Sequence, residues 1–385
     1  MPLHFAPEEH ARRLERTCAA MAEAELDALL CFKQESMYWL TGYNSFGYCF
    51  FQCLVLRADG RMVLLTRAPD LRQSRHTSTL EDIRVWVDRE GADPAAELRD
   101  VLSGLGLAGR RLGVEWETHG LTAANGARLT TALSGFATLA DASLLVSRQR
   151  LVKSPAELAV VRRAAELADA ALAAAIEHAR PGADEGVILA RMHDAIFEGG
   201  GDYPGNPFII GSGPGALLCR YFSGRRRLDP VDQLTLEFAG VHRQYHACLM
   251  RTLLVGEASA RHRELFDTAR EALLACESRL VPGATMGEVF AAHAEAFDRR
   301  GLTAHRLNAC GYSLGAVYAP SWMDWPMFYA GNPVLMEPGM VFFLHMILMD
   351  SGSGTAMTLG RTSIVGEGGA EPLSKAPLEL VVRRG

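Results

Sequence analysis

The sequence lacks the features that mark membrane and secreted proteins. No stretch of about 18 residues or more is apolar and free of charge, so neither a membrane-spanning helix nor a membrane partner is predicted. The first residues, MPLHF, show no basic flank followed by an apolar run, so a signal peptide is not expected. The eight cysteines include no CxxC pair. Without a secretion signal, reduced thiols and a cytoplasmic location are expected.

Clusters of basic residues are also scarce. The chain has 39 Lys and Arg against 45 Asp and Glu, which gives a formal net charge of −6. Its one dense basic run, Arg225–Arg227, is typical of a solvated turn rather than of a phosphate-binding patch. A nucleic-acid partner is therefore not expected.

The length of 385 residues suits two domains. In the first part, short apolar runs alternate with helical stretches, which predicts a small α/β domain. The composition changes at 147–155, where Ser154, Pro155 and Glu157 have the residue types of a helix start. The domains are therefore predicted at 1–150 and 151–385.

The second part combines long helices with strands. Helices are predicted at 156–180, 185–198, 258–278 and 285–300. Strands are predicted at 206–211, 217–221, 233–240, 245–255, 309–316, 340–349 and 358–366. This order describes an α+β domain with mostly antiparallel strands.

Four segments of the second part carry a family resemblance. They are RLVKSPAELAVVRRAAELAD, YHACLMRT, GYSLG and MEPGMVFFLHM, which begin at Arg150, Tyr245, Gly311 and Met336. In order and spacing they resemble the creatinase, Xaa-Pro peptidase and methionine aminopeptidase superfamily. The resemblance implies a C-terminal pita-bread fold behind an N-terminal α/β domain of the creatinase and prolidase type. It also implies a homodimer.

The resemblance identifies five positions that bind two metal ions in the family. Here they hold Glu237, Cys248, Tyr312, His345 and, with the least certain assignment, Gly360. Hard divalent ions prefer several carboxylate and other oxygen ligands, which this set cannot easily supply. The prediction is therefore that the protein uses no metal and no other cofactor. A single Zn²⁺ on Glu237, Cys248 and His345 is the alternative, because Zn²⁺ accepts N, S and O ligands.

Within the superfamily, creatinase and ectoine hydrolase are relatives that lack the metal ligands. The run GYSLGAVYAPSW at 311–322 is similar to a segment of ectoine hydrolases. The catalytic His of creatinase would fall near Arg220, and this difference speaks against creatine as the substrate.

The residues themselves indicate acid–base chemistry. If Glu237 pairs with Cys248 in a hairpin, strand alternation places both side chains and His246 on one face. Glu237 could then act as a base on water or as a nucleophile. His246 or His345 could carry the proton, and Tyr312 could donate a hydrogen bond to the tetrahedral centre. For the two histidines, a satisfied place in the core is the alternative.

Five residues are candidates for substrate contact: Arg220, Cys248, Trp322, Tyr48 and Phe50. Arg220 suits a substrate carboxylate, and a salt bridge with Asp229 is its alternative. Trp322 belongs to an aromatic segment at 319–331 that suits a cationic group, or else a packed loop or dimer contact. The resemblance implies that Tyr48 and Phe50 reach the catalytic pocket of a neighbouring subunit.

Taken together, the sequence predicts a cytoplasmic, homodimeric, metal-independent hydrolase. Its reaction would be the cleavage of a C–N bond in a small nitrogenous solute that carries a carboxylate. Two alternatives stay open: an Xaa-Pro dipeptidase or aminopeptidase with an atypical metal site, and a non-catalytic pita-bread module that binds a partner.

Overall fold

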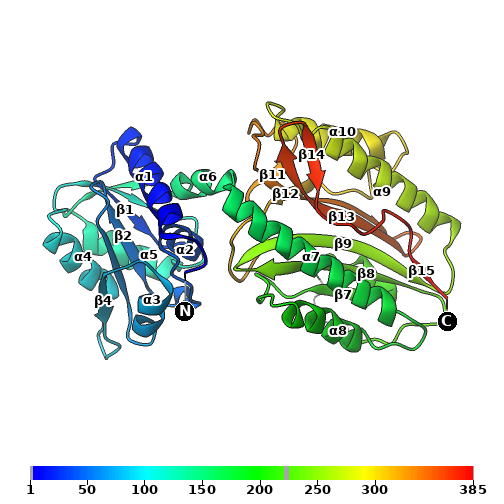
Figure 1. The fold of residues 1–385 in the computed structure, drawn as a ribbon, viewed down its shortest axis with the longest axis horizontal. Helices are drawn as coiled ribbons and strands as arrows, with labels where there is room; N and C mark the ends of the chain where they lie inside the picture. The colour runs from blue at the N-terminus through cyan, green and yellow to red at the C-terminus, as the bar shows by residue number, and fades with distance from the viewer. Residues whose placement is uncertain (1–2, 221–224, 385) are drawn as a thin grey trace. The chain divides into compact units, whose positions relative to one another are not determined.

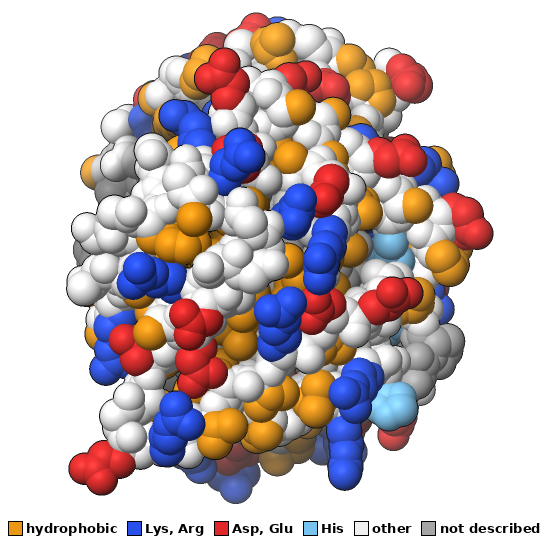
Figure 2. All heavy atoms as spheres, turned by 90° about the vertical axis from the view of Figure 1, so that its left-hand side faces the viewer, with side chains coloured by type: hydrophobic (Ala, Val, Ile, Leu, Met, Phe, Trp, Pro, Cys, Tyr) orange, Lys and Arg blue, Asp and Glu red, His pale blue; other side chains and the backbone are white. Residues whose placement is uncertain are grey.

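The computed structural model describes residues 3–220 and 225–384 and divides the chain into two compact units, Met1–Arg150 and Leu151–Gly385. Figure 1 draws the first in blue to cyan and the second mainly in green to red. No helix within the described residues is both long enough and apolar enough to cross a membrane. On the face drawn in Figure 2, Lys and Arg side chains are interspersed with Asp and Glu.

The N-terminal unit is built on a six-stranded sheet with the order β4-β3-β2-β1-β5-β6. β2 pairs antiparallel with β1 and β3, and the other neighbours are parallel. The strands are β1 (Ala28–Cys31), β2 (Cys53–Arg57), β3 (Met62–Arg67), β4 (Asp82–Trp86), β5 (Arg111–Val114) and β6 (Thr138–Asp141). The helices are α1 (Pro7–Glu23), α2 (Gln34–Thr41), α3 (Asp70–Thr77), α4 (Pro94–Gly104), α5 (Ala123–Leu133) and α6 (Leu145–Leu151). The sheet is buried on both sides, because Leu30 and Leu29 pack into different cores. The predicted α/β character is confirmed.

The C-terminal unit contains a sheet with the main order β11-β10-β12-β13-β9-β8-β7. β14 pairs with β13, and β15 pairs with β9. The strands are β7 (Ile209–Ser212), β8 (Asp232–His242), β9 (Tyr245–Val255), β10 (Ala309–Ser313), β11 (Asp324–Tyr329), β12 (Val341–Asp350), β13 (Thr355–Gly366), β14 (Gly369–Pro372) and β15 (Val382–Arg383). Only the β15–β9 pair is parallel, so the predicted antiparallel character is confirmed.

Four long helices accompany this sheet (Figure 1): α7 (Pro155–His178), α8 (Glu185–Glu198), α9 (Ala260–Ser278) and α10 (Met286–Asp298). α7 begins as predicted. The Ser154 side chain accepts a hydrogen bond from the Glu157 backbone, Glu157 bonds back to Ser154, and Pro155 occupies the first turn.

The helices pack against one face of the sheet. A Cβ at Gly240 would lie 2.0 Å from the carbonyl oxygen of Ala164 in α7, so glycine permits this close packing. Leu236 lies on that same face of β8. It pairs with Arg251 of β9, and Arg251 pairs in turn with Leu359 of β13, so all three side chains lie on one face. Leu359 packs in the core formed with α9 and α10. The opposite face, which we call the site face, carries the residues considered below.

One predicted strand in this unit, 217–221, is wrong. Gly213–Leu217 form a 3₁₀ helix, η2, and Arg220 lies in a turn; residue 221 lies outside the described residues. Strands β11, β14 and β15 lie outside the predicted strands, and β11 contains Pro326. β11 is at the end of the main strand order, and an edge strand tolerates a proline that cannot donate to the ladder.

Candidate functional site

The β8–β9 hairpin places the first candidate residues. Its turn is Arg243–Gln244, both with positive φ, and His242 pairs with Tyr245. Glu237 therefore pairs with Met250, and the predicted pairing with Cys248 is wrong by two residues. Because the shift is an even number, Glu237 and Cys248 still share the site face.

The strand register brings distant segments together on the site face. One row of paired residues runs across five strands: Ile209, Glu237, Met250, Gly360 and His345. In the next row, Thr362 Oγ1 bonds the Cys248 backbone at 2.8 and 3.0 Å, and Phe343 pairs with both Thr362 and Tyr312. The five positions that the resemblance identifies therefore lie in two adjacent rows.

Glu237 is the ionisable centre of this arrangement. It is about nine-tenths buried, with 9% of its surface exposed. Tyr312 Oη donates to Glu237 Oε1 at 3.2 Å, and the Trp322 indole N–H donates to Tyr312 Oη at 2.8 Å. Burial raises the pKa of Glu237 to about 7, although the Tyr312 hydrogen bond and the Arg220 charge lower it. A carboxyl group with this pKa can both accept and return a proton near neutral pH.

Trp322 and Tyr312 are held by each other. Trp322 exposes 2% of its surface, and its indole N–H is engaged by Tyr312. The predicted contact of Trp322 with a substrate therefore has little surface available, and the geometry favours support of Tyr312. Burial raises the pKa of Tyr312 well above its usual range, so its hydroxyl stays protonated.

His345 lies beside Tyr312, and one of its ring nitrogens has no hydrogen-bond partner among the described residues. Its ring centroid is 5.7 Å from that of Tyr312 and 5.6 Å from that of Phe343. Its Nδ1 is buried and has no hydrogen-bond partner among the described residues. Burial lowers the pKa of His345 to about 4, so the imidazole is neutral near pH 7. A neutral ring with a free nitrogen suits the handling of a substrate proton.

His246 has no such freedom. It is fully buried, its Nε2 accepts from the Gly205 N–H at 2.8 Å, and its Nδ1 lies 2.9 Å from the Gln244 carbonyl oxygen. This pattern requires the neutral tautomer with the proton on Nδ1. Burial lowers the pKa of His246 to about 4. The geometry therefore speaks against the predicted proton transfer by His246, because both ring nitrogens are already bonded to the backbone.

Cys248 is fully buried, and burial raises the pKa of its thiol well above the usual range. A protonated thiol is a poor nucleophile. Since none of its surface is exposed, the predicted substrate contact would require movement of its neighbours.

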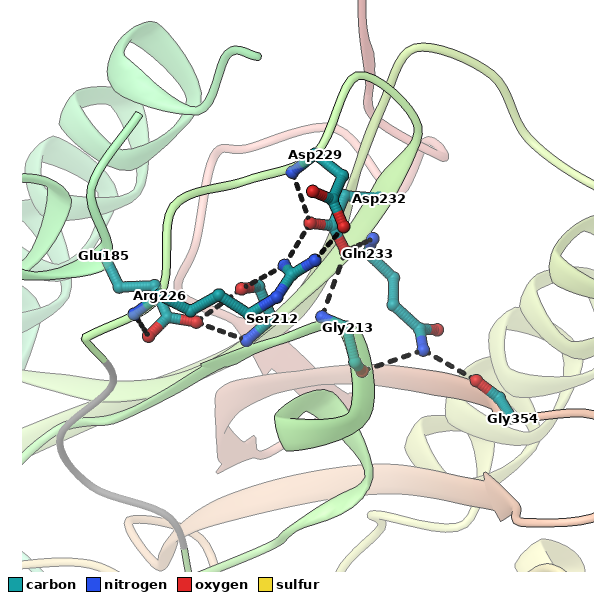
Figure 3. A network of polar contacts seen from close by, with 8 residues as sticks. All are labelled: Glu185, Ser212, Gly213, Arg226, Asp229, Asp232, Gln233 and Gly354. Atoms are coloured by element: carbon teal, nitrogen blue, oxygen red, sulfur yellow. Dashed lines mark hydrogen bonds and ion pairs between the residues drawn. The ribbon is translucent and has the colours of Figure 1, made fainter. Parts of the chain in front are cut away.

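Arg220 lies in the turn after η2 with its side chain exposed, not on a strand as predicted. Its positive charge lowers the pKa of both Glu237 and His345, so it lies within electrostatic reach of both. The alternative salt bridge with Asp229 is wrong within the described residues, because Asp229 pairs with Arg226 (Figure 3). Arg220 is therefore the cation whose charge acts on the Glu237 carboxylate within the described residues.

A polar cluster holds the two ends of the segment that carries Arg220 (Figure 3). Glu185 Oε1 accepts from the Ser212 N–H at 2.6 Å, and Glu185 Oε2 accepts from the Arg226 N–H at 3.2 Å. Asp232 accepts from the Gly213 N–H at 3.0 Å and also pairs with Arg226. The buried Glu185 carboxylate at the start of α8 thus accepts hydrogen bonds from Ser212 and from Arg226, the two residues that flank 213–225.

The residues do not fit the two metal ions that the fold family implies. One carboxylate, one protonated thiol, one phenol and one imidazole replace the oxygen-rich set, and Gly360 offers no side-chain donor. A Cβ at Gly360 would lie 2.7 Å from the Leu344 carbonyl oxygen and 2.9 Å from Phe343 Cε2. The Phe343 ring therefore fills the space that a ligand at 360 would need. Within residues 3–220 and 225–384, no three His, Cys, Asp or Glu side chains are grouped to hold a metal.

Tyr48 and Phe50 belong to the N-terminal unit. Tyr48 is buried, and burial raises its pKa to about 12. Phe50 exposes 48% of its surface, and the Arg67 guanidinium lies 3.9 Å from its ring centroid. Their contact with a substrate in a neighbouring subunit stays a prediction.

Several relatives are similar to this chain over nearly its full length. Ectoine hydrolase of Halomonas elongata is 27% identical over 402 residues, with 99% of each chain covered. The uncharacterized hydrolase/peptidase y4tM of Sinorhizobium fredii is 28% identical over 396 residues, again with 99% of each chain. The probable dipeptidase PepE of Mycobacterium tuberculosis is 27% identical over 382 residues, with 98% of each chain.

Solved structures show the same fold. Dipeptidase PepE from Mycobacterium ulcerans superposes with a TM-score of 0.86 at 25% identity, covering 99% of this chain and 100% of the other. The prolidase from Thermococcus sibiricus gives a TM-score of 0.87 at 18% identity, covering 97% and 99%.

Family profiles cover both units. The Creatinase/Prolidase N-terminal domain matches residues 13–152, and Metallopeptidase family M24 matches residues 159–369, more than half of the chain. The predicted resemblance and pita-bread fold are thereby confirmed. The chain belongs to metallopeptidase family M24.

Proposed function

We propose that this M24 hydrolase cleaves a C–N bond in a small nitrogenous, carboxylate-bearing solute, and that it does so without a metal. The observation that carries the proposal is Glu237: a buried carboxyl group with a pKa of about 7, bonded to Tyr312, in a site whose donors do not fit metal ions. The full-length similarity to an ectoine hydrolase supports the same reaction class. As the sequence predicts, we include a cytoplasmic homodimer in the proposal.

The reaction follows from the residues on the site face. Ionised Glu237 takes a proton from water while the water oxygen bonds to the amidine or amide carbon. The C–N bond then breaks, and the proton held by Glu237 passes to the leaving nitrogen. In the second route, Glu237 attacks that carbon directly, the C–N bond breaks, and the leaving nitrogen takes a proton from water. A second water molecule then hydrolyses the bond between Glu237 and the substrate carbon and releases the carboxylate.

Tyr312 and His345 assist in different ways. Tyr312 fixes the Glu237 carboxylate through the 3.2 Å hydrogen bond. Its predicted bond to the tetrahedral centre requires release of Glu237 and stays a prediction. Nδ1 of His345 has no hydrogen-bond partner within the described residues, and a small movement of its neighbours would let it accept an N–H of the substrate and orient the leaving nitrogen. Arg220 supplies the cation for the substrate carboxylate, where a guanidinium offers two parallel donors.

The second candidate function is a dipeptidase, which the full-length similarity to PepE favours. It predicts a metal requirement, which the donor set and the Phe343 ring at Gly360 oppose. A purely binding module would gain nothing from a carboxylate that is costly to bury and has one hydrogen bond.

The test combines metal analysis with a substrate screen. The purified enzyme is assayed with and without a chelator against ectoine, creatine, related cyclic amidines and Xaa-Pro dipeptides. We expect substoichiometric metal and chelator-resistant hydrolysis of an amidine or amide solute. Stoichiometric metal that is essential for dipeptide cleavage would instead establish the dipeptidase, and inactivity on every compound would support the binding module.

A further inference from the structure

His246 is a buried histidine that the reaction above does not use. Neither a proton nor a substrate can reach its ring nitrogens without breaking a backbone hydrogen bond, because Nε2 and Nδ1 are bonded to Gly205 and Gln244. Burying such a polar ring is costly unless its nitrogens are hydrogen-bonded, and here both are bonded to the backbone. The segment that it holds leads to the site.

The first link is between His246 and Gly205. The Gly205 N–H donates to Nε2 at 2.8 Å, which fixes the backbone of this loop over β9. Gly205 in turn packs against the chain near Trp322, since a Cβ there would lie 2.8 Å from the Ser321 carbonyl oxygen and 2.9 Å from the Trp322 nitrogen. The two backbones are therefore in direct contact, and the histidine sets the position of one of them.

The second link is the neighbouring residue, Asn206. Its Oδ1 accepts from the Trp322 backbone N–H at 3.1 Å, while its Nδ2 donates to the Pro207 carbonyl oxygen at 3.0 Å. The amide is thus oriented with its oxygen toward Trp322. The 205–206 loop is therefore bonded to His246 through Gly205 and to the Trp322 backbone through Asn206.

The third link reaches the carboxylate. The Trp322 indole N–H donates to Tyr312 Oη at 2.8 Å, and Tyr312 Oη donates to Glu237 Oε1 at 3.2 Å. Each group has one donor direction, so a displaced indole would lose Tyr312, and a displaced Tyr312 would lose Glu237. A misplacement of about 1 Å is enough to lower a rate by roughly 10²-fold.

We propose that His246 is a positioning residue for Glu237, acting through Gly205, Asn206, Trp322 and Tyr312. The acceptor on its Nε2 holds the 205–206 loop, and that loop presents the indole N–H to Tyr312. The effect on rate rests on the proposed function of Glu237. The effect on the indole can be measured whether or not a substrate is known.

The test uses two variants that separate the ring nitrogens. In His246→Gln, the side-chain oxygen reaches the place of Nε2 and still accepts from the Gly205 N–H. In His246→Asn, the shorter amide reaches only the place of Nδ1, so the Gln244 bond can form and the Gly205 bond cannot. The readouts are kcat, KM and the NMR signal of the Trp322 indole N–H, assigned with Trp322→Phe.

We expect His246→Gln to keep kcat within about fivefold and to keep the indole signal in place. His246→Asn should lower kcat by about tenfold or more with little change in KM, and should shift the indole signal. His10→Gln is the control: His10 is also buried, and its Nδ1 lies 3.3 Å from the Trp39 carbonyl oxygen in the N-terminal unit, so stability should change while kcat and the indole signal should not.

An unshifted indole signal in His246→Asn would overturn the proposal, and so would equal kcat losses in the Gln and Asn variants. If the histidine variants do not fold, Asn206→Ala breaks the same relay at a half-buried residue and must shift the indole signal. If the indole signal responds as expected but kcat does not, the relay does not position a working carboxylate, and the positioning role is lost. Inactivity of the unaltered enzyme on every substrate would count against the proposed function alone.

Discussion

Glu115 in the N-terminal unit and Glu237 in the C-terminal unit are two buried glutamates with the same raised pKa of about 7, and burial is the largest cause in both. Their hydrogen bonds differ. Glu115 accepts from the N–H groups of Phe32 and Lys33 at 3.0 and 2.9 Å and from Ser36 Oγ at 2.5 Å. Glu237 accepts one hydrogen bond within the described part of the chain, from Tyr312.

This difference in hydrogen bonding indicates a structural role for Glu115 and leaves the Glu237 carboxylate able to accept further hydrogen bonds. The donors around Glu115 belong to the start of α2, so this residue satisfies N–H groups that a helix start leaves without partners. Glu237 has lone pairs to spare and a small exposed surface on the site face. A raised pKa therefore does not distinguish the two residues; the unfilled hydrogen-bonding capacity of Glu237 is what makes it the candidate catalytic group.

The largest effect should come from the same substitution at both positions. Glu237→Gln keeps shape but removes the base, so kcat should fall by roughly 10²-fold or more, about 2.7 kcal/mol in activation free energy. Glu115→Gln should leave kcat unchanged, because its amide can still accept from the backbone and donate to Ser36 Oγ. Steady-state kinetics of both variants checks the comparison.

Two controls accompany this pair. Thermal unfolding should show that Glu237→Gln is at least as stable as the unaltered protein, because an undersatisfied buried acid is removed. Retention of most activity in Glu237→Gln would move the chemistry to another residue, with His345 the next candidate.

The next effect is on stability and should appear at the other glutamate. Glu115→Ala leaves the Phe32 and Lys33 N–H groups and the Ser36 hydroxyl without their acceptor. We expect a loss of about 2 kcal/mol in the free energy of unfolding, measured with denaturant. A loss no larger than that of Glu115→Gln would show that water or a neighbour replaces the carboxylate.

A smaller effect is expected at Arg220. If Arg220 binds a substrate carboxylate, Arg220→Lys should lower kcat/KM by about tenfold, because an ammonium cannot offer two parallel donors. A substrate analogue with the carboxylate converted to an amide should be poor already and should lose little more in the variant. Equal losses for acid and amide would show that Arg220 does not contact the carboxylate.

The smallest effect concerns pH. In the proposed reaction Glu237 works in its ionised form, so the rate should rise with pH through its pKa of about 7. The Arg220 charge lowers that pKa, so Arg220→Gln should raise it and move the acid limb of the kcat/KM profile to higher pH. The shift should stay below about one unit, since Arg220 is exposed and solvent and salt screen its charge. An acid limb that moves to lower pH would contradict the assignment of this limb to Glu237.

Much of the fold could be read from short windows of sequence. The start of α7 follows from Ser154, Pro155 and Glu157, and the alternation in 232–255 predicts two paired strands. The common face of Glu237 and Cys248 also requires a turn with an even number of residues, because one position is odd and the other even. That turn does not follow from the sequence, because Arg243–Gln244 adopts positive φ without the Asn-Gly or Asp-Gly signal that marks such turns.

By itself, the sequence determined the family, the order of most elements and the residue types that replace the metal ligands, because composition, periodicity and motif spacing are local properties. Only the tertiary structure decided which groups each residue contacts there. It committed both nitrogens of His246 to backbone partners, left Nδ1 of His345 without a hydrogen-bond partner in the described part of the chain, and joined Glu237 to Tyr312 across 75 positions of the chain. These outcomes depend on sheet register and on loops that meet from distant segments, and no short window of sequence contains that information.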